Sequence, residues 1–428
     1  MRVAVIGAGI VGVTTAYELA SDGHAVTVYE RRSSVSEETS FANAGVVAPG
    51  YVTPWAAPGM PTKVLRHLLG RHAPVRLGLP MAPGQLRWLW RWWRACRPAV
   101  YAANRAQMYR LARYSQQRLN QLTSALALER ERSPGYLVLL RSNRELAQAR
   151  GGLKLLAELG VNFALVTPER ARQIEPGLNP QTPLHAAVHL PDDEVGNCRQ
   201  FSHLLKAQAQ ALGADFRFQR EVMAIRSGPT PVVVHRVAEG PERSAPTLED
   251  SVDAIVVCAA IGSVKLLAPL GLRLPLLPVY GYSLTAPLRH LDHHPDAGPR
   301  SGVMDERYKV AISRLGARVR VAGSAEIGGR PEAHNPSAIA TLYKVLDDWF
   351  PGCAQQAKVQ AWKGARPMLP DGPPVVGASG KAGIWLNLGH GSSGWALSCG
   401  SARLIADQIA GRSASIDAEG LSLTRLGR

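Results

Sequence analysis

The chain lacks the features that define several protein classes. Its five cysteines are scattered, with no close pair at metal or redox spacing, so neither a metal site nor a disulfide framework is expected. No run of about twenty uninterrupted apolar residues exists, and no spanning helix is expected. The apolar start has one early cation and no distinct cleavage site, which argues against a signal peptide. At 428 residues, two or three folding units are expected.

Acidic residues are also missing from a long internal stretch. Between Thr39 and Leu128 there is no Asp or Glu, although the chain carries a net charge of +16. The cations of this stretch are Lys63, Arg66, Arg71, Arg76, Arg87, Arg91, Arg94, Arg97, Arg105, Arg110, Arg113 and Arg118. Such a concentration of positive charge indicates an anionic partner, which can be lipid headgroups, nucleic acid or an acidic ligand.

One part of the cationic stretch is also rich in tryptophan. At 100° per residue, residues 85–97 place Arg87, Arg91, Arg94 and Arg97 in one arc, with Leu86, Leu89, Trp92 and Trp93 facing away from it. A helix of this kind suits a membrane interface. The alternative is a helix that packs its tryptophans into the protein. A nucleic-acid partner is not expected, because no nucleic-acid motif accompanies the charge.

The first thirty residues have the pattern of a βαβ unit. The β-branched residues 2–6 predict a buried strand, Gly7-Ala-Gly-Ile-Val-Gly12 follows, and a second strand over 25–29 ends at Glu30. In such a unit Gly7 permits the tight turn, Gly9 admits a pyrophosphate and Gly12 lets helix and strand pack closely. Glu30 is placed to accept hydrogen bonds from a ribose diol. The pattern predicts a dinucleotide site without specifying which dinucleotide.

Two further segments favour a flavin. A second strand–glycine turn–helix unit occurs at 383–409, with Gly389-His-Gly-Ser-Ser-Gly394 as its turn. The small-residue loop Thr39-Ser-Phe-Ala-Asn-Ala-Gly45 suits close approach by a planar cofactor. Taken alone, each is also compatible with an ordinary packing turn.

Several segments resemble the FAD-dependent D-amino acid dehydrogenases of the small-subunit type, within the wider D-amino-acid, glycine and sarcosine oxidase family. The matching stretches run through the chain in the expected order and are residues 2–30, 38–45, 49–58, 281–283, 305–309, 364–372 and 389–395. The Pro49-Gly-Tyr and Pro54-Trp-Ala-Ala-Pro58 strings are the most dehydrogenase-specific. Tyr280 stands where a basic residue is expected.

The resemblance implies an α/β fold in which non-covalent FAD binds a discontinuous Rossmann-type domain beside an α+β substrate domain with an antiparallel sheet. The implied FAD-binding domain comprises 1–82, 190–262 and 365–428, and the substrate domain 83–189 and 263–364. The implied cofactor-binding residues are Val3, Ile6, Gly7, Gly9, Ile10, Val11, Gly12, Glu30, Arg31, Ser40, Asn43, Ala44, Gly45, Val222, Ala260, Gly262, Gly389, His390, Gly391, Ser392, Gly394 and Trp395.

A substrate carboxylate needs a planar, bidentate cation, and the resemblance assigns this role to Arg366. Tyr282 and Tyr308 are further candidate donors, and Arg314 is a reserve cation; for both tyrosines a half-buried strand aromatic is the alternative. His390 is equally compatible with a place beside the flavin and with a structural role. No general base is expected, because the Cα hydrogen of a neutral amine can leave as hydride to FAD.

The implied reaction is oxidative deamination of D-amino acids to 2-oxo acids and ammonia. Electrons would pass to a quinone or another respiratory-chain acceptor, at the cytoplasmic face of the inner membrane or in the cytoplasm, with or without a partner subunit. The alternative is an oxidase or dehydrogenase of glycine, sarcosine or D-proline derivatives that uses the same site.

Overall fold

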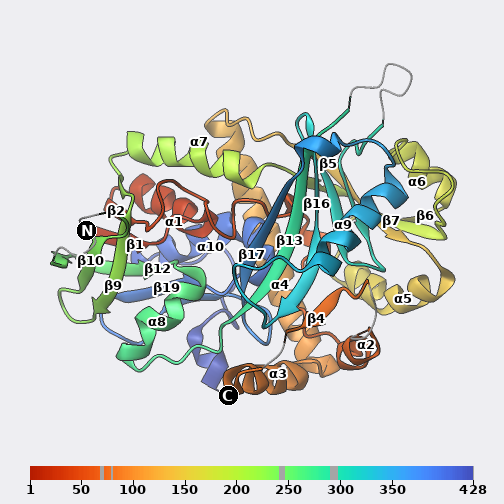
Figure 1. Ribbon diagram of the computed structural model, residues 1–428. Helices are drawn as coiled ribbons and strands as arrows, with labels where there is room; N and C mark the ends of the chain where they lie inside the picture. The colour runs from red at the N-terminus through yellow and green to blue at the C-terminus, as the bar shows by residue number, and fades with distance from the viewer. Residues whose placement is uncertain (68–71, 79–80, 241–245, 290–296, 428) are drawn as a thin grey trace.

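The computed structural model describes residues 1–67, 72–78, 81–240, 246–289 and 297–427. Figure 1 shows two halves side by side, each built on a β-sheet. One half holds the N-terminal strand and the helices α1 (Ile10–Ser21), α7 (Cys198–Ala211) and α10 (Gly394–Ile409). The other is dominated by long strands, with α9 (Pro336–Trp349) across one face.

The first half contains a six-stranded sheet in the order β18-β19-β12-β1-β2-β8. The strands are β1 (Arg2–Ile6), β2 (Ala25–Tyr29), β8 (Asp215–Arg217), β12 (Ala254–Val257), β18 (Val375–Ala378) and β19 (Ile384–Leu388). All neighbours are parallel except β18 and β19. The central strands are buried on both faces, which explains their continuous β-branched runs.

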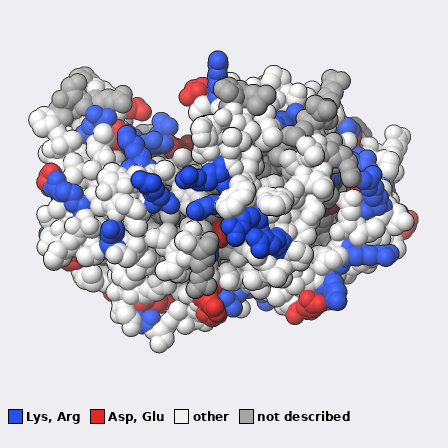
Figure 2. All heavy atoms as spheres, turned by 90° about the horizontal axis from the view of Figure 1, so that it is seen from below, with Lys and Arg blue, Asp and Glu red and all other residues white. Residues whose placement is uncertain are grey.

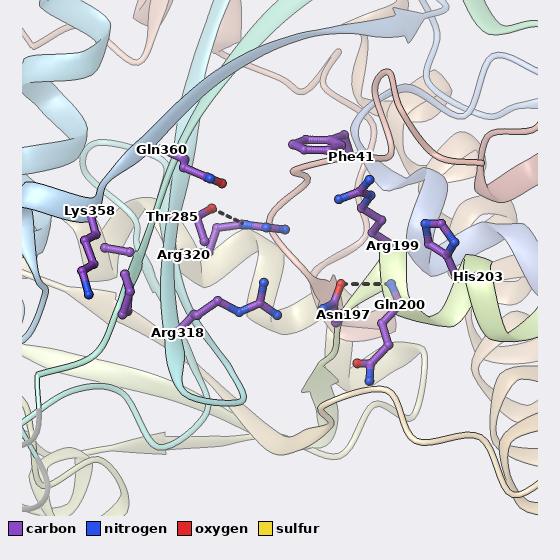
Figure 3. Close-up of a pocket in the computed structure, with 12 residues that line it drawn as sticks. Phe41, Asn197, Arg199, Gln200, His203, Thr285, Arg318, Arg320, Lys358 and Gln360 are labelled. Atoms are coloured by element: carbon purple, nitrogen blue, oxygen red, sulfur yellow. Dashed lines mark hydrogen bonds between the residues drawn. The ribbon is translucent and has the colours of Figure 1, made fainter. Parts of the chain in front are cut away.

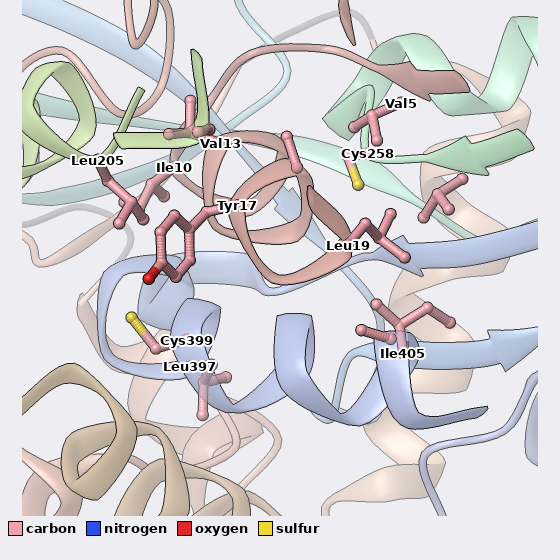
Figure 4. Close-up of a cluster of buried hydrophobic side chains, with 14 of the residues drawn as sticks. Val5, Ile10, Val13, Tyr17, Leu19, Leu205, Cys258, Leu397, Cys399 and Ile405 are labelled. Atoms are coloured by element: carbon pink, nitrogen blue, oxygen red, sulfur yellow. The ribbon is translucent and has the colours of Figure 1, made fainter. Parts of the chain in front are cut away.

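Each face of this sheet is covered by a different layer. Side chains of α1, α7 and α10 form one core with alternate residues of β1, and Figure 4 shows Tyr17 and Leu19 of α1 lying beside Leu397 and Ile405 of α10. On the opposite face lie α8 (Ser263–Leu267) and a three-stranded sheet of β9 (Arg220–Arg226), β10 (Val232–Val237) and β11 (Leu248–Ser251).

The second sheet has ten strands, and its main path is β17-β13-β16-β15-β14-β5-β7-β3. Their bounds are β3 (Val46–Val47), β5 (Ser133–Leu140), β7 (Ala186–Val195), β13 (Leu277–Pro287), β14 (Gly302–Asp305), β15 (Val310–Leu315), β16 (Arg318–Ile327) and β17 (Gln360–Met368). Two short strands complete it, β4 (Val75–Leu77) on β16 and β6 (Ala164–Val166) on β7. Apolar residues of α9 bury one face of β13, β15 and β16.

The division into domains remains a prediction, and some elements lie across its bounds. Helix α4 (Pro98–Ala125) belongs to the predicted substrate part, yet Met108 and Leu111 share the core of α1 and α10. The short strands β3 and β4 belong to the predicted FAD-binding part but pair with the ten-stranded sheet. The remaining helices are α2 (Met60–His67), α3 (Pro83–Ala95), α5 (Asn143–Glu158) and α6 (Pro168–Ile174).

A buried carboxylate ties α4 to α1 and α10. Glu18 of α1 is fully buried and accepts hydrogen bonds from Arg118 of α4, at 2.7 and 2.9 Å, and from Arg403 of α10, at 2.8 Å. A buried carboxylate is tolerated only when charged donors satisfy it, so these two arginines fix the relative position of the three helices.

The arginine- and tryptophan-rich helix is observed as α3, but its tryptophans are divided between core and surface. Trp88 and Trp92 are buried, and Trp88 Nε1 donates to Met368 O at 3.1 Å. Trp90 and Trp93 are 52% and 60% exposed. Trp92 and Trp93, which the sequence places together away from the arginines, therefore differ in exposure, because Trp92 packs against Trp55.

Candidate active site

The turn between β1 and α1 has the geometry that its glycines predict. Gly7 has φ +99°, and a Cβ on Gly12 would lie 1.8 Å from the Gly7 carbonyl oxygen. Helix α1 begins after Gly9, whose position has no side-chain cap, and Ile10 N–H donates to Ser40 Oγ at 3.1 Å. Backbone N–H groups at an uncapped helix start favour an anion such as a pyrophosphate.

Glu30 lies beside this turn, where the ribose of the dinucleotide is predicted to bind. Its carboxylate accepts hydrogen bonds from Ala8 N at 2.7 Å and from Arg32 N at 2.8 Å. Burial raises the pKa of Glu30, and these two donors offset part of that rise. The carboxylate therefore lies directly beside the glycine turn, where the sequence places it. Arg31 instead lies at the surface and pairs with Glu38.

The small-residue loop 39–45 is fixed against the second sheet. Arg320 Nη1 donates to Asn43 O at 3.0 Å, and Ser313 Oγ donates to Ala44 O at 2.8 Å. Gly45 has φ +74° and accepts from Gly196 N at 2.7 Å. These contacts hold the backbone of the loop between the two halves of the molecule, a position suited to a planar ring.

The C-terminal glycine turn leads from β19 to α10. Gly389 and Gly391 have φ +78° and +57°, and a Cβ on Gly391 would lie 2.8 Å from Met368 Sδ. His390 is buried, and its Nε2 lies 2.9 Å from Ser401 Oγ. Burial lowers the pKa of His390 to about 3, so the ring is neutral at physiological pH. Of the two predicted alternatives for His390, this environment agrees with a structural role.

The other predicted cofactor residues are distributed around these turns. Val3 and Ile6 lie in β1, Val11 in the first turn of α1, Val222 in β9, and Ala260 and Gly262 in the 3₁₀ turn after β12. Ala260 has φ +46°, a conformation uncommon for a residue with a side chain and frequent at ligand sites. Ser392 is exposed, and Gly394 begins α10. The Trp395 ring is buried 5.1 Å from that of Phe201, so it lies in the core of the first half.

Arg366 lies on β17 at the junction of the two halves. Arg366 is half-buried as a residue, and its guanidinium donates to Ser324 O at 2.7 Å and has no carboxylate partner among the residues that the structure describes. Burial lowers its pKa to about 10, which leaves the group charged at neutral pH. Gly281 on β13 makes room for it, because a Cβ there would lie 2.3 Å from Arg366 Nη2. A desolvated, unpaired guanidinium is a site for a carboxylate.

The loop and the C-terminal turn both reach the strand that carries Arg366. Thr39 Oγ1 donates to the carbonyl of Ala365 at 2.7 Å, and Met368 forms a β-bridge with His390. Three segments distant in the sequence therefore meet at one end of β17.

The structure does not bring the other predicted catalytic residues to Arg366. Tyr282 follows Gly281 on β13 and so points to the opposite sheet face, where its hydroxyl donates to buried Glu326. Tyr308 packs with the core under α9. Arg314 donates to Gly316 O at 3.1 Å. It follows Ser313 on β15, and because Ser313 faces the loop, Arg314 points to the other face of the sheet. These geometries agree with a structural role for all three residues.

The departure at Tyr280 also lies away from Arg366. Tyr280 and Tyr282 share a face, and Lys363 Nζ lies over both rings, 4.3 and 5.4 Å from their centroids. Lys363, on the neighbouring strand, thus places a positive charge beside Tyr280, the position where the family resemblance expects a basic residue.

Two residues on the Arg366 side were not among the predicted site residues. Ser283 is buried on the same face as Gly281, and its hydroxyl has no hydrogen-bond partner among the described residues. Arg320 positions Asn43. The Gly-Tyr-Ser string contained Ser283, but only the strand register reveals which of its side chains faces Arg366.

Comparison with known proteins identifies the family of this chain. The profile of the family described as "FAD dependent oxidoreductase" matches residues 2–408. The chain belongs to that family. This oxidoreductase is 43% identical to a D-amino acid dehydrogenase of Cereibacter sphaeroides, across 99% of its own length and 95% of the relative. It is 41% identical to a D-amino acid dehydrogenase of Azorhizobium caulinodans, across 99% of its own length and 100% of the relative.

Solved structures share the fold of this oxidoreductase at low sequence identity. Glycine oxidase from Geobacillus kaustophilus has a TM-score of 0.74 at 20% identity, with 99% of each chain covered. L-proline dehydrogenase from P. horikoshii has a TM-score of 0.72 at 17% identity, with 100% of this chain and 98% of that chain covered. The predicted α/β class and the FAD cofactor are confirmed; the individual roles of the site residues remain predictions.

Proposed function

We propose that this FAD-dependent oxidoreductase deaminates D-amino acids oxidatively, giving 2-oxo acids and ammonia. The observation that carries the proposal is the desolvated Arg366 guanidinium, which has no ion-pair partner among the described residues and lies at the junction of the glycine turns. The curated relatives named D-amino acid dehydrogenase support the substrate class. They are about twice as similar in sequence as the glycine oxidase fold neighbour, which disfavours the glycine or sarcosine alternative.

The protein's contribution to this reaction is orientation. Arg366 holds the substrate carboxylate as a bidentate pair, and Ser324 O fixes the guanidinium. Gly281, with no Cβ, leaves the space that the guanidinium needs. Bound FAD supplies the two-electron acceptor for the Cα hydride. Neutral His390 has its Nε2 engaged by Ser401, so we assign no proton transfer to it.

Anaerobic spectroscopy of the FAD-loaded protein tests this function. We expect D-alanine to bleach the flavin absorbance and release pyruvate and ammonia, whereas L-alanine leaves the spectrum unchanged. Bleaching by glycine or sarcosine but not by D-alanine would refute the proposal. Reoxidation under air compared with reoxidation by a quinone analogue then identifies the class of electron acceptor, which we propose to be a quinone.

We further propose that α3 contacts an anionic membrane surface. Leu86, Trp90 and Trp93 are more than half exposed, and the guanidinium of Arg94 lies 4.8 Å from the Trp90 ring centre. Figure 2 shows Lys and Arg side chains spread over the face of the molecule on which α3 lies in Figure 1. Aromatic and basic side chains together suit the headgroup region. No helix in the described part of the chain is long and apolar enough to cross a bilayer.

Co-sedimentation with vesicles tests the membrane contact. We expect Trp90→Ser/Trp93→Ser to bind vesicles of anionic phospholipid more weakly than the unsubstituted protein. The matched control is Leu212→Ser/Leu248→Ser, which removes two other exposed apolar side chains, 49% and 52% exposed, outside α3. Equal losses in both variants would refute a specific role for α3.

A further inference from the structure

A second cationic site lies apart from Arg366. A cavity of about 600 Å³ opens between the N-terminal end of α7 and the ends of β13, β16 and β17. Its lining residues are Phe41, Asn197, Arg199, Gln200, His203, Thr285, Ala286, Pro287, Arg318, Arg320, Lys358 and Gln360, with no Asp or Glu among them. Figure 3 shows Arg199 and the pair Arg318 and Arg320 pointing toward one another from opposite walls.

This cavity is distinct from the carboxylate site on the same sheet. Thr285 and Gln360, which line it, are cross-strand partners, and Val279 and Arg366 pair six residues farther along the same two strands. Six residues of strand correspond to about 20 Å. Phe41 and Trp362 stack between the two positions, with ring centroids 6.3 Å apart.

The positive charge of the cavity is largely unneutralised. Three arginines and one lysine line the cavity. Of these four, only Arg318 has an ion pair among the described residues, with its Nη2 2.7 Å from Glu131 Oε2. Arg199 lies over the Phe41 ring at 4.4 Å, and its buried Nε has no hydrogen-bond partner. Burial, and then the charge of Arg318, lower the pKa of Arg320 to about 10. Charges held together in this way repel one another until an anion neutralises them.

The arrangement distinguishes among anions. Guanidinium groups approach from two opposite walls, and α7 directs its N-terminal end to the cavity with Asn197 as N-cap. A planar carboxylate engages one guanidinium fork, whereas a tetrahedral phosphate offers oxygens in several directions at once. Helix N-termini also favour phosphate. We propose that this cationic cavity binds a phosphate-bearing small molecule, with the phosphate between Arg199 and Arg318 and the remainder against Phe41.

Isothermal titration of FAD-loaded protein with pyrophosphate tests the proposal, because bound FAD fills the nucleotide site. We expect Arg199→Gln/Lys358→Gln to weaken pyrophosphate binding by about tenfold or more, since hydrogen bonds to charged groups are stronger than neutral ones. The control Lys154→Gln/Lys381→Gln removes the same net charge from exposed positions outside the cavity and should retain the affinity.

Three results would overturn the proposal: no pyrophosphate binding at millimolar concentration, equal weakening in both double variants, or tighter binding of citrate than of pyrophosphate. If the double variant fails to retain FAD, Lys358→Gln is measured alone, because Lys358 is exposed. This single variant should bind pyrophosphate about threefold more weakly, because it removes one positive charge from the lining of the cavity. Unchanged affinity in a variant that keeps its FAD would also refute the assignment.

Discussion

Arg366→Ala provides the strongest test of the active-site assignment. The guanidinium is desolvated, has no carboxylate partner among the described residues, and is anchored by Ser324 O. Removing one partner of a buried ion pair costs about 3–5 kcal/mol. At about 1.4 kcal/mol per decade, kcat/KM for D-alanine should fall by roughly two to four decades. The loss should fall on both KM and kcat, because the carboxylate contact positions the substrate as well as binding it.

The assay is stopped-flow reduction of the flavin by D-alanine, with FAD content measured for each variant. Arg366→Lys should recover part of the rate, since a lysine restores the charge but not the bidentate fork. Arg314→Ala is the matched comparison, because Arg314 contacts backbone carbonyls on the other sheet face, and it should stay within about tenfold of the original rate. Wild-type kcat/KM in Arg366→Ala, or an equal loss in Arg314→Ala, would refute the reasoning.

Two further predictions concern cofactor binding and pH. Gly12→Ala should abolish FAD binding, measured as flavin per protein, because its Cβ meets a backbone oxygen at 1.8 Å; Gly84→Ala, in open space, should retain it. Burial raises the pKa of Asp193 to about 7, so its contribution to stability is complete below the unfolded pKa near 4 and is lost as the pH rises through 7. Asp193→Asn should therefore raise Tm by a few degrees at pH 8 but not at pH 4, and a rise only at pH 4 would contradict this sign.

The sequence alone determined the βαβ unit that begins the first half of the molecule. A buried strand, a glycine turn, a helix and a terminal acid are local features, because each depends on neighbouring residues and on backbone freedom at fixed spacing. Gly7, Gly12 and Glu30 accordingly lie as their pattern predicts. The resemblance extended this reading to FAD and to the α/β class.

Tertiary structure decided which side chains reach the substrate site. Successive residues of a strand face opposite sides, so the pairing register, and not residue type, separates Gly281 and Ser283 from Tyr282. Packing also decided that Trp92 is buried while Trp93 is exposed. Arg320 and its neighbours gather only when α7 meets the ends of three strands, because long-range contacts of this kind leave no spacing signal in the sequence.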